Sequence, residues 1–388
     1  MVKLGDVCGV NPPKKQIIDI LEGKKVSFIP MSSVSEDGNI DVNEIRDYSE
    51  VSNGFSYFKE NDVLFAKITP CMENGKGAIA SRLFNGVGVG STEFHILRPD
   101  ENYIISEWVY RYLSFSKVRK LAEKSMTGSA GQKRVPKTFL ENLKIPLPPL
   151  EIQKYIANIL DKTQEIIDDH KNQLEELDYL IKAIFYDMFG DLVLNEKNWK
   201  VSTVEKSCKD IYGGGTPSKS KPEYYVGNIP WVTPKDMKAI SITDSIDHIN
   251  EDAINNSSAK LVPANSILMV IRSGILKKTL PVAINKVDVA MNQDMKAFVV
   301  NDTVNPEYLL YYFIMTQSNI LKNVRSVTAD NIEFRLIKNA SLPLPQIELQ
   351  NKFAQIVTEI EEQKSIVKQS ITESQTLFNS LMSKYFDQ

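Results

Sequence analysis

Two long stretches of the chain place apolar residues at alternating steps of three and four positions, with polar residues between them. The first series is Leu160, Thr163, Ile167, His170, Leu174, Leu177, Ile181, Ile184 and Met188. The second series is Val357, Ile360, Lys364, Val367, Ile371, Ser374, Phe378, Leu381 and Tyr385. A spacing of about 3.5 residues over about four heptads is typical of a helix that packs along one seam. The polar members of each series favour two helices of one chain that pack on each other.

Both helical stretches begin with nearly the same proline-rich segment. Ile145–Gln153 reads IPLPPLEIQ, and Leu342–Gln350 reads LPLPQIELQ. The two segments are 197 positions apart, and this offset holds without a gap to the C-terminus. Proline fixes φ and lacks an amide donor, so each segment is extended before its helix begins. A long fixed offset predicts two copies of a whole module.

The blocks before the helices also resemble each other, at an offset near 200 positions. Lys3–Cys8 matches Thr203–Cys208, and Glu107–Leu113 matches Glu307–Phe313. Each block has short β-rich runs separated by turns, among them residues 63–68 and 267–271. An aromatic helix follows them, near residues 106–125 in the first block and 306–321 in the second. This mixture predicts a compact α+β unit that is present twice.

We therefore predict the α+β class, with two mixed α/β domains joined by two long antiparallel coiled-coil helices in pseudo-two-fold symmetry. The predicted segments are residues 1–150 for the first domain, 151–191 for the first helix, 192–345 for the second domain and 346–388 for the second helix. A second, thinner apolar stripe leaves helix surface that the two helices alone would not cover. It consists of Ile159, Ile166, Leu180, Ile356 and Leu377. We expect a partner protein to dock on it.

Composition narrows the class of protein. The chain has 388 residues, of which 42% are hydrophobic and 24% are charged, as is ordinary for a soluble globular protein. The N-terminus lacks the basic-then-apolar order of a signal peptide, and no apolar run approaches the roughly 18 residues that span a membrane. These features predict a cytoplasmic protein without a membrane segment.

The net charge of −3 hides an uneven distribution. Residues 151–191 contain 10 acidic and 4 basic residues, and residues 346–388 contain 6 and 4. The predicted helices are therefore acidic, whereas the two blocks are mildly basic. This balance permits local phosphate-binding patches without demanding them.

The sequence offers no catalytic or metal site. Asn11-Pro12-Pro13-Lys14 is similar to the signature of amino methyltransferases but lacks the aromatic residue that stacks on the extruded adenine. Gly213–Ser220 is similar to a phosphate loop but has Ser218 where a glycine is required. Three cysteines and three histidines are too scattered for a metal centre. We predict a binding protein rather than an enzyme.

Polar and basic loop residues are the candidates for DNA contacts. Asn and Gln can read adenine, Arg or Lys can read guanine, and most lysines would contact only phosphate. In the first block the candidates are Lys67, Thr69, Lys76, Ser91, Thr92, Glu93, Gln132, Lys133 and Arg134. In the second block they are Thr216, Ser218, Lys219, Lys221, Lys235, Arg272, Ser273, Lys277, Lys278, Asn292 and Gln293.

Taken together, these motifs resemble the DNA specificity subunit of type I restriction-modification systems. The resemblance spans the chain, and four features carry it: the repeated Pro-Leu-Pro-x-x-Glu-x-Gln segment, Gly214–Ser218, Ile229-Pro230-Trp231 and the Gly128–Gln132 loop. The first block departs from the pattern because Asn11-Pro12-Pro13 stands where the second block has Gly-Gly-Thr-Pro-Ser.

The resemblance implies that the two blocks are target-recognition domains, each reading one half of a split site in double-stranded DNA. It also implies partnership with two modification (methyltransferase) subunits and with restriction (endonuclease and translocase) subunits. S-adenosylmethionine, ATP and magnesium would then belong to those partners, and this chain would bind no cofactor. We expect the helix length to help set the gap between half-sites. A coiled-coil adaptor with two protein-binding domains is the alternative.

Overall fold

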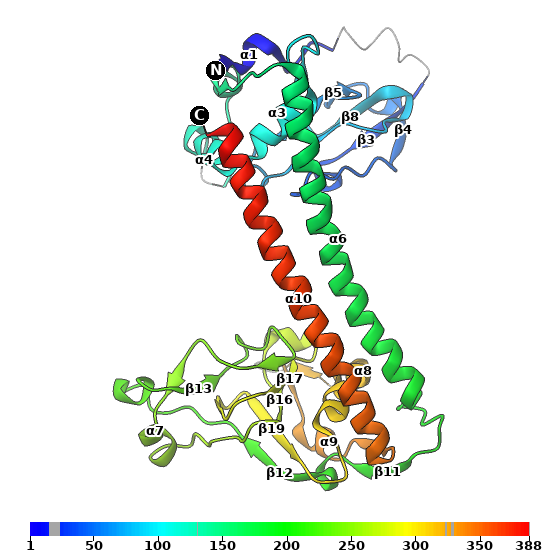
Figure 1. Ribbon diagram of the computed structural model, residues 1–388, viewed down its shortest axis with the longest axis vertical. Helices are drawn as coiled ribbons and strands as arrows, with labels where there is room; N and C mark the ends of the chain where they lie inside the picture. Colours follow the sequence, from blue (N-terminus) through cyan, green and yellow to red (C-terminus); the bar gives the residue numbers. More distant parts are fainter. Residues whose placement is uncertain (15–23, 130, 323, 327–329, 388) are drawn as a thin grey trace. The chain divides into compact units, whose positions relative to one another are not determined.

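The computed structural model describes residues 1–14, 24–129, 131–322, 324–326 and 330–387. Its contacts divide the chain into two units. Unit 1 comprises Met1–His170 and Ser370–Gln388, and unit 2 comprises Lys171–Gln369. Each unit therefore contains one of the two similar blocks together with part of each long helix, α6 (Leu150–Phe189) and α10 (Ile347–Phe386) (Figure 1).

The described part of unit 1 contains two four-stranded sheets. Their strand orders are β2-β9-β6-β7 and β4-β3-β8-β5, and β3 and β8 are the parallel neighbours. The strands are β2 (Cys8–Val10), β3 (Lys25–Ile29), β4 (Ile45–Asp47), β5 (Ser56–Lys59), β6 (Val63–Ala66), β7 (Gly77–Ile79), β8 (Val87–Gly90) and β9 (Phe94–Pro99). A short pair, β1 (Val2–Lys3) with β10 (Lys144–Ile145), ties the N-terminus to the segment before α6.

The described part of unit 2 contains a five-stranded sheet in the order β12-β19-β16-β17-β14 and a three-stranded sheet in the order β15-β13-β18. These strands are β12 (Cys208–Gly213), β13 (Ile229–Val232), β14 (Ser241–Ile242), β15 (His248–Ile249), β16 (Ile267–Val270), β17 (Val282–Asn285), β18 (Ala290–Met291) and β19 (Met295–Val300). Two further pairs are β11 (Lys200–Thr203) with β22 (Ser341–Leu344) and β20 (Val324–Ser326) with β21 (Asp330–Ile332).

The central strand of each unit is buried on both faces. In β6, Val63 and Phe65 point into one hydrophobic cluster, whereas Leu64 and Ala66 point into another. In β16, Ile267 and Met269 likewise enter a different cluster from Leu268 and Val270. Because side chains alternate along a strand, an uninterrupted apolar run satisfies both faces at once.

Short helices pack beside these sheets. In unit 1 they are α1 (Leu4–Val7), α3 (Ser106–Ser114), α4 (Ser116–Ser125) and α5 (Lys137–Asn142). In unit 2 they are α7 (Glu251–Asn255), α8 (Pro306–Leu321) and α9 (Phe334–Lys338). The single helix expected near residues 106–125 is two helices, because Phe115 between them is extended, with φ −63° and ψ 128°. The helix expected over residues 306–321 is continuous.

The two long helices run antiparallel within each unit. In unit 2, the rings of Phe185 and Phe353 are 5.2 Å apart, and farther along the pair Asp178 contacts Lys364. In unit 1, the ring of Phe386 near the end of α10 lies 4.5 Å from that of Trp108, beside the start of α6. The predicted class, mixed α/β units with two long antiparallel helices, is confirmed.

A buried glutamine fixes the start of each long helix. The Gln153 side chain accepts a bond from Ile105 N (3.1 Å) and donates to the carbonyls of Tyr103 and Pro148 (both 2.8 Å). The Gln350 side chain does the same with Asn305 N (2.9 Å), Thr303 O (3.2 Å) and Pro345 O (2.8 Å). Both glutamines are 0% exposed. A buried amide side chain must find hydrogen-bond partners, and these backbone groups supply them, which explains why the segment is repeated so closely.

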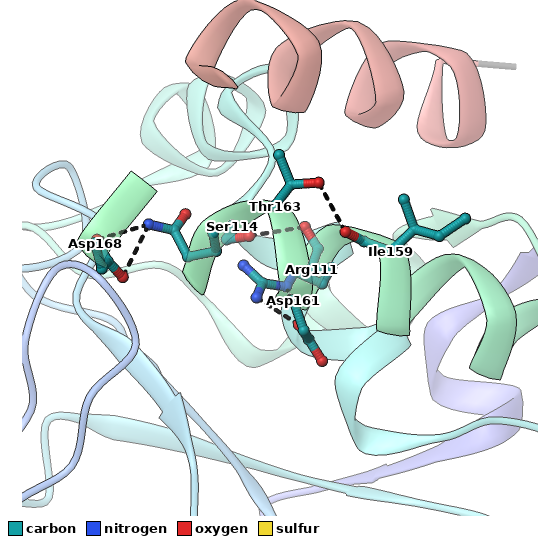
Figure 2. A network of polar contacts seen from close by, with 7 residues as sticks. Arg111, Ser114, Ile159, Asp161, Thr163 and Asp168 are labelled. Carbon is teal, nitrogen blue, oxygen red and sulfur yellow. Dashed lines mark hydrogen bonds and ion pairs between the residues drawn. The ribbon is translucent and has the colours of Figure 1, made fainter. Parts of the chain in front are cut away.

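An arginine attaches α3 to α6 in unit 1. Arg111, which is 9% exposed, donates from Nε to Asp161 Oδ1 at 2.9 Å, and its Nη2 lies 2.5 Å from the same oxygen (Figure 2). Figure 2 also shows the Thr163 hydroxyl donating to the carbonyl of Ile159, at 2.8 Å. Thr163, a polar position of the seam, is thus satisfied by its own helix.

The polar seam position of unit 2 is satisfied differently. Lys364 is only 6% exposed, and its Nζ lies 2.7 Å from Asp178 Oδ1 and 2.6 Å from Glu361 Oε1. At the offset of 197, the equivalents of these three residues in the other repeat are Ile167, Gln375 and Gln164. The three charges therefore occur together in unit 2 and are absent together from the matching positions.

Candidate nucleic-acid interface

Three segments of unit 1 meet where β6 ends and β9 begins, and we call their meeting point the unit-1 junction. Lys67 follows β6, Glu93 precedes β9, and Arg134 belongs to the segment after α4. The Lys67 amide donates to Glu93 O (2.9 Å), and the amide of Val135 donates to Lys67 O (2.9 Å). An isolated bridge pairs Ile68 with Arg134. Eight of the nine first-block candidates lie on these segments, and Lys76 is the exception.

An ion pair dominates the unit-1 junction. Arg134 donates to Glu93 through Nε (2.9 Å) and Nη2 (2.8 Å), one bond to each carboxylate oxygen. The Arg134 bonds hold the pKa of Glu93 below its usual value, against the opposing effect of burial. Lys67 lies on the same strand end, Thr69 N donates to Lys133 O (3.1 Å), and the Thr69 hydroxyl donates to Glu73 (2.8 Å).

Three more first-block candidates, Ser91, Thr92 and Gln132, lie beside these residues. Ser91 Oγ accepts from the amide of Glu93 (3.2 Å), which fixes the turn before β9. Thr92 and Gln132 are exposed, as is Lys133. Lys76 is directed elsewhere, because its Nζ donates to the carbonyl of Met31 (3.2 Å).

His95 is attached to the unit-1 junction by a hydrogen bond to the backbone of Val135. Its Nε2 lies 2.8 Å from Val135 O, and its Nδ1 lies 2.9 Å from the Asn11 side-chain amide. A carbonyl can only accept, so Nε2 carries the proton and Nδ1 accepts from Asn11. Burial lowers the pKa of His95, so the neutral ring is the one that fits. Asn11 belongs to the segment that is similar to a methyltransferase signature. Its role in this structure is to hold His95 and the start of β9 by hydrogen bonds.

Unit 2 builds the same junction. Ile271 follows β16, and its amide donates to the carbonyl of Asp294, which precedes β19 (2.8 Å). The Ile332 amide donates to Ile271 O (2.9 Å), and an isolated bridge pairs Arg272 with Asn331. These contacts match those of unit 1 one for one, and we call this the unit-2 junction.

An arginine and a carboxylate also meet here. Arg272 Nε donates to Asp294 Oδ1 (2.6 Å), and its Nη2 lies 2.6 Å from the same oxygen. Asn292 donates to Asp294 Oδ2 (3.2 Å) and accepts from the Asp294 amide (3.1 Å). Sequence reasoning found Arg272 and Asn292 but missed Asp294. Its signal is its place directly before an apolar strand, where the first block has Glu93.

The glycine-rich turn of unit 2 lies against this junction. Gly214 and Gly215 pass so close to neighbouring backbone that a Cβ on either would lie 1.7 Å from Asn292 O or 2.2 Å from Ser258 O, respectively. Thr216 donates to the side chain of Gln293. The glycines are therefore required for the close packing of this turn.

An aromatic cavity of about 640 Å³ opens beside the turn. Trp231 forms one wall, donates from Nε1 to Gly215 O (3.1 Å), and meets the ring of Tyr225 edge-on at 5.7 Å. Lys219, Lys235 and the unit-2 junction residues Asn292 and Asp294 also line the cavity. Sequence reasoning predicted Lys219, Lys235 and Asn292 here but did not select the aromatic walls.

The remaining second-block candidates lie around this face or beside it. Ser218 hydrogen-bonds Ser220 (2.8 Å), and Lys221 donates to the Tyr224 hydroxyl (2.9 Å). Ser273 caps the short 3₁₀ helix Gly274–Lys277, and Lys278 follows it as an exposed residue.

The predicted partner stripe is exposed in part. Ile166, Leu180 and Leu377 are 48%, 45% and 53% exposed. Ile159 is half-buried, and so is Ile356, which packs against the core of unit 2. Exposed aromatic residues that sequence reasoning did not include, Tyr155, Tyr179 and Tyr186, lie on α6.

Neither a metal-binding cluster nor a membrane-spanning helix occurs among the residues that the structure describes. No group of His, Cys, Asp and Glu side chains in that part of the chain could hold a metal ion. Within the same residues, no helix combines the length and the apolar character needed to cross a membrane.

A duplicated α+β unit with a polar strand-end junction, attached to paired long helices, defines a class of two-domain recognition proteins. The family model for the type I restriction modification DNA specificity domain matches residues 1–179 and 196–374. The chain therefore belongs to this family and contains two copies of its domain.

Curated relatives carry the same description. The EcoR124I/EcoR124II specificity subunit of Escherichia coli is 32% identical over 268 residues, which is 66% of this chain and 64% of that protein. The Escherichia coli EcoEI specificity subunit is 38% identical over 174 residues, 44% of this chain and 29% of that protein. The matched regions thus span less than two thirds of these relatives.

Solved structures share the fold. A chain from a study of complex assembly and conformational transition in the type I R-M system has a TM-score of 0.62 and 19% identity, covering 99% of this chain and 96% of that one. The type I restriction-modification S subunit from M. genitalium has a TM-score of 0.60 and 15% identity, covering 99% and 95%.

Proposed function

We propose that this chain is the sequence-reading specificity subunit of a type I restriction-modification complex. Each unit reads one half of a bipartite site in double-stranded DNA, and the chain itself performs no catalysis. The observation that carries the proposal is that both copies of the specificity domain build the same strand-end junction while presenting different side chains there. A shared scaffold with different exposed residues is what two half-sites of different sequence require.

The partners follow from the same proposal. Two modification subunits dock on the exposed apolar residues of α6 and α10, including Ile166, Leu180 and Leu377, and restriction subunits join the complex. S-adenosylmethionine, ATP and magnesium are bound by those partners rather than by this chain. Exposed apolar side chains at helical spacing are suited to such docking because their burial is favourable.

The decisive experiment is to express the chain with its cognate modification subunits and to sequence the methylated adenines of the host genome. We expect one bipartite motif that disappears when the gene for this chain is deleted. In a parallel test, Leu180→Asp with Leu377→Asp should prevent co-purification with the modification subunits. Glu165→Asp, a conservative change at an exposed position of α6, is the control. Methylation without a split motif, or a complex that survives both Asp substitutions, would contradict the corresponding part of the proposal.

We also propose that helix length limits the gap between half-sites. Both α6 and α10 have 40 residues, or about 60 Å at 1.5 Å per residue. Adding four residues between Glu165 and Gln173 adds about 6 Å and slightly more than one turn. The methylated motif should keep both half-sites and gain a longer gap. An unchanged gap would show that the helices do not determine it.

A further inference from the structure

In the two junctions the carboxylate occupies the equivalent position, whereas the arginine comes from a different segment. Glu93 and Asp294 each precede the equivalent strand, and the amide of each is held by the side chain two residues earlier, Ser91 or Asn292. The arginines come from opposite members of one bridged pair. In unit 1 the bridge joins Ile68 to Arg134, and in unit 2 it joins Arg272 to Asn331. Both guanidinium groups nevertheless reach the carboxylate at the same strand end.

Each guanidinium keeps donors available. Arg134 uses Nε and Nη2 for Glu93 and Nη1 for Gln132 O (3.1 Å), which are three of its five N–H groups. The contacts of Arg272 in the described part of the chain are with Asp294, through Nε and Nη2. The arginine side chains are 41% and 50% exposed, so a ligand can approach them from solvent.

The carboxylates decide what these arginines can bind. A phosphate approaching such a pair would meet a carboxylate of the same sign within a few ångströms, and the arginine charge is already compensated. A base edge carries no net charge. Guanine presents O6 and N7 as two neighbouring acceptors in the major groove, which a guanidinium of fixed orientation can bind together.

We propose that Arg134 and Arg272 each read one guanine, in the half-site of their own unit, and that Glu93 and Asp294 are positioning residues that fix the guanidinium planes. This inference rests on the proposed function and adds base identity to it. The surrounding lysines, Lys133, Lys219 and Lys235, would contact phosphates and carry no base preference.

The test uses the complex of the full chain with its modification subunits, after the bipartite motif has been determined. Arg134→Ala and Arg272→Ala are compared with wild type in genome methylation and in binding to oligonucleotides that carry 7-deazaguanine at each guanine in turn. Arg46→Ala is the matched control, because Arg46 pairs with Glu44 at 2.5 Å on the surface of unit 1, outside the junction.

Each alanine variant should relax one guanine position in one half-site and leave the other half-site unchanged. A bidentate contact corresponds to about 10- to 100-fold discrimination, and we expect most of it to be lost. In wild type, 7-deazaguanine at that position should weaken binding about tenfold, since N7 is removed. In the matching variant the same substitution should have no effect. Arg46→Ala should preserve both half-sites.

The positioning role has its own readout. Asp294→Asn and Glu93→Gln keep the arginine but remove the negative charge, so discrimination at the guanine should fall while binding to unrelated DNA rises. A residue that only stabilised the fold would weaken both. Arg134→Lys and Arg272→Lys retain a positive charge and test whether the planar fork is needed.

Three outcomes would overturn the inference. The first is uniform weakening on all sequences with a salt slope lower by about one, which marks a phosphate contact. The second is a half-site with no guanine that responds to its arginine. In both cases the bipartite motif persists, so the proposed function stands. The third is a wild-type complex that methylates no bipartite motif, in which case the proposed function fails and the inference fails with it.

Discussion

The helix starts and the strand-end junctions differ in how closely the two repeats agree. At the helix starts, Gln153 and Gln350 make the same three kinds of hydrogen bond to equivalent backbone groups. At the junctions, the backbone contacts are again equivalent, but the arginine changes segment from Arg134 to Arg272. Buried polar groups must keep their partners, whereas exposed side chains on the same backbone are free to differ.

The seam between the long helices differs between the repeats in another way, because its three charged residues are present or absent together. Lys364, Asp178 and Glu361 form a charged cluster, and all three matching positions in the other repeat are uncharged. A buried ammonium group is tolerated only with its partners, so a lysine gained without carboxylates, or carboxylates lost from around a lysine, would be costly. Exchanging residues between the two repeats therefore tests whether their seams are interchangeable.

The largest effect is expected from Ile167→Lys. Ile167 is 0% exposed, and its neighbours at the matching positions, Gln164 and Gln375, carry no charge. An unpaired buried lysine should cost on the order of 3–5 kcal/mol of unfolding free energy, measured by urea denaturation. Adding Gln164→Glu and Gln375→Asp supplies the partners found in the other repeat and should recover a large part of this loss. No recovery would mean that the two seams are not interchangeable.

Gln153→Leu should come next. It removes three hydrogen bonds and leaves the amide of Ile105 and the carbonyls of Tyr103 and Pro148 without partners, at about 3 kcal/mol in all. Hydrogen exchange should report faster opening in unit 1 and no change in unit 2, and Gln350→Leu should give the reverse. Gln355→Leu is the control, because Gln355 is an exposed residue of α10 whose bond is to Glu359. Equal losses in both units from one substitution would contradict local anchoring.

Much of the fold could be predicted because its signals are periodic. The 3.5-residue spacing gave helices close to the observed Leu150–Phe189 and Ile347–Phe386. The apolar runs at β6 and β16 gave the central strands of both units. The break at Phe115 was not predicted, because no local pattern marks it; its ring lies 6.4 Å from that of Phe386, which is 271 positions away in the sequence.

The site could be predicted only by residue type. Arg134, Glu93 and Arg272 were selected as polar loop residues, yet nothing in the sequence indicated that they form carboxylate pairs at matching strand ends. Asp294 was missed because an aspartate in a loop is usually solvated. Its role depends on the register of β16 and β19, which brings Arg272 to it. Lys76 has the same residue type as Lys67 and the same candidate role by sequence, but its side chain is bonded to the carbonyl of Met31.

A smaller, pH-dependent effect on stability is expected in unit 1, where His95 lies. Burial is the main cause of the lowered pKa of His95, Lys67 and Lys137 add to it, and the bond to Val135 O and the charge of Glu93 oppose it. The unfolded chain therefore takes up a proton at higher pH than the folded one. The free energy of unfolding is therefore highest above about pH 6.5, where His95 is neutral in both states. It falls as pH decreases towards the lower folded-state pKa, by at most about 1.4 kcal/mol per pH unit.

This loss should appear as weaker hydrogen-exchange protection of unit 1 at pH 5.5 than at pH 7.5, and it should be reduced in His95→Asn, which cannot titrate. Glu93 acts at lower pH, because its pKa lies below an already acidic value, so it does not interfere in this range. The same pH dependence in wild type and His95→Asn would assign the effect to another group.

The smallest effect is expected from Lys364→Ile, which gives unit 2 the residue of the other repeat. Replacing a buried charged group by an apolar one is often neutral or stabilising, because the desolvation cost of the ammonium disappears. Asp178 and Glu361 lose their partner but are 55% and 34% exposed, so water can solvate them. We expect a change in unfolding free energy within about 1 kcal/mol. Asp178→Asn with Glu361→Gln leaves the lysine buried without a carboxylate and should cost more than Lys364→Ile. If Lys364→Ile proves the more damaging change, the cluster contributes net stability, and the charged seam would then be a requirement of unit 2 rather than one of two equivalent solutions.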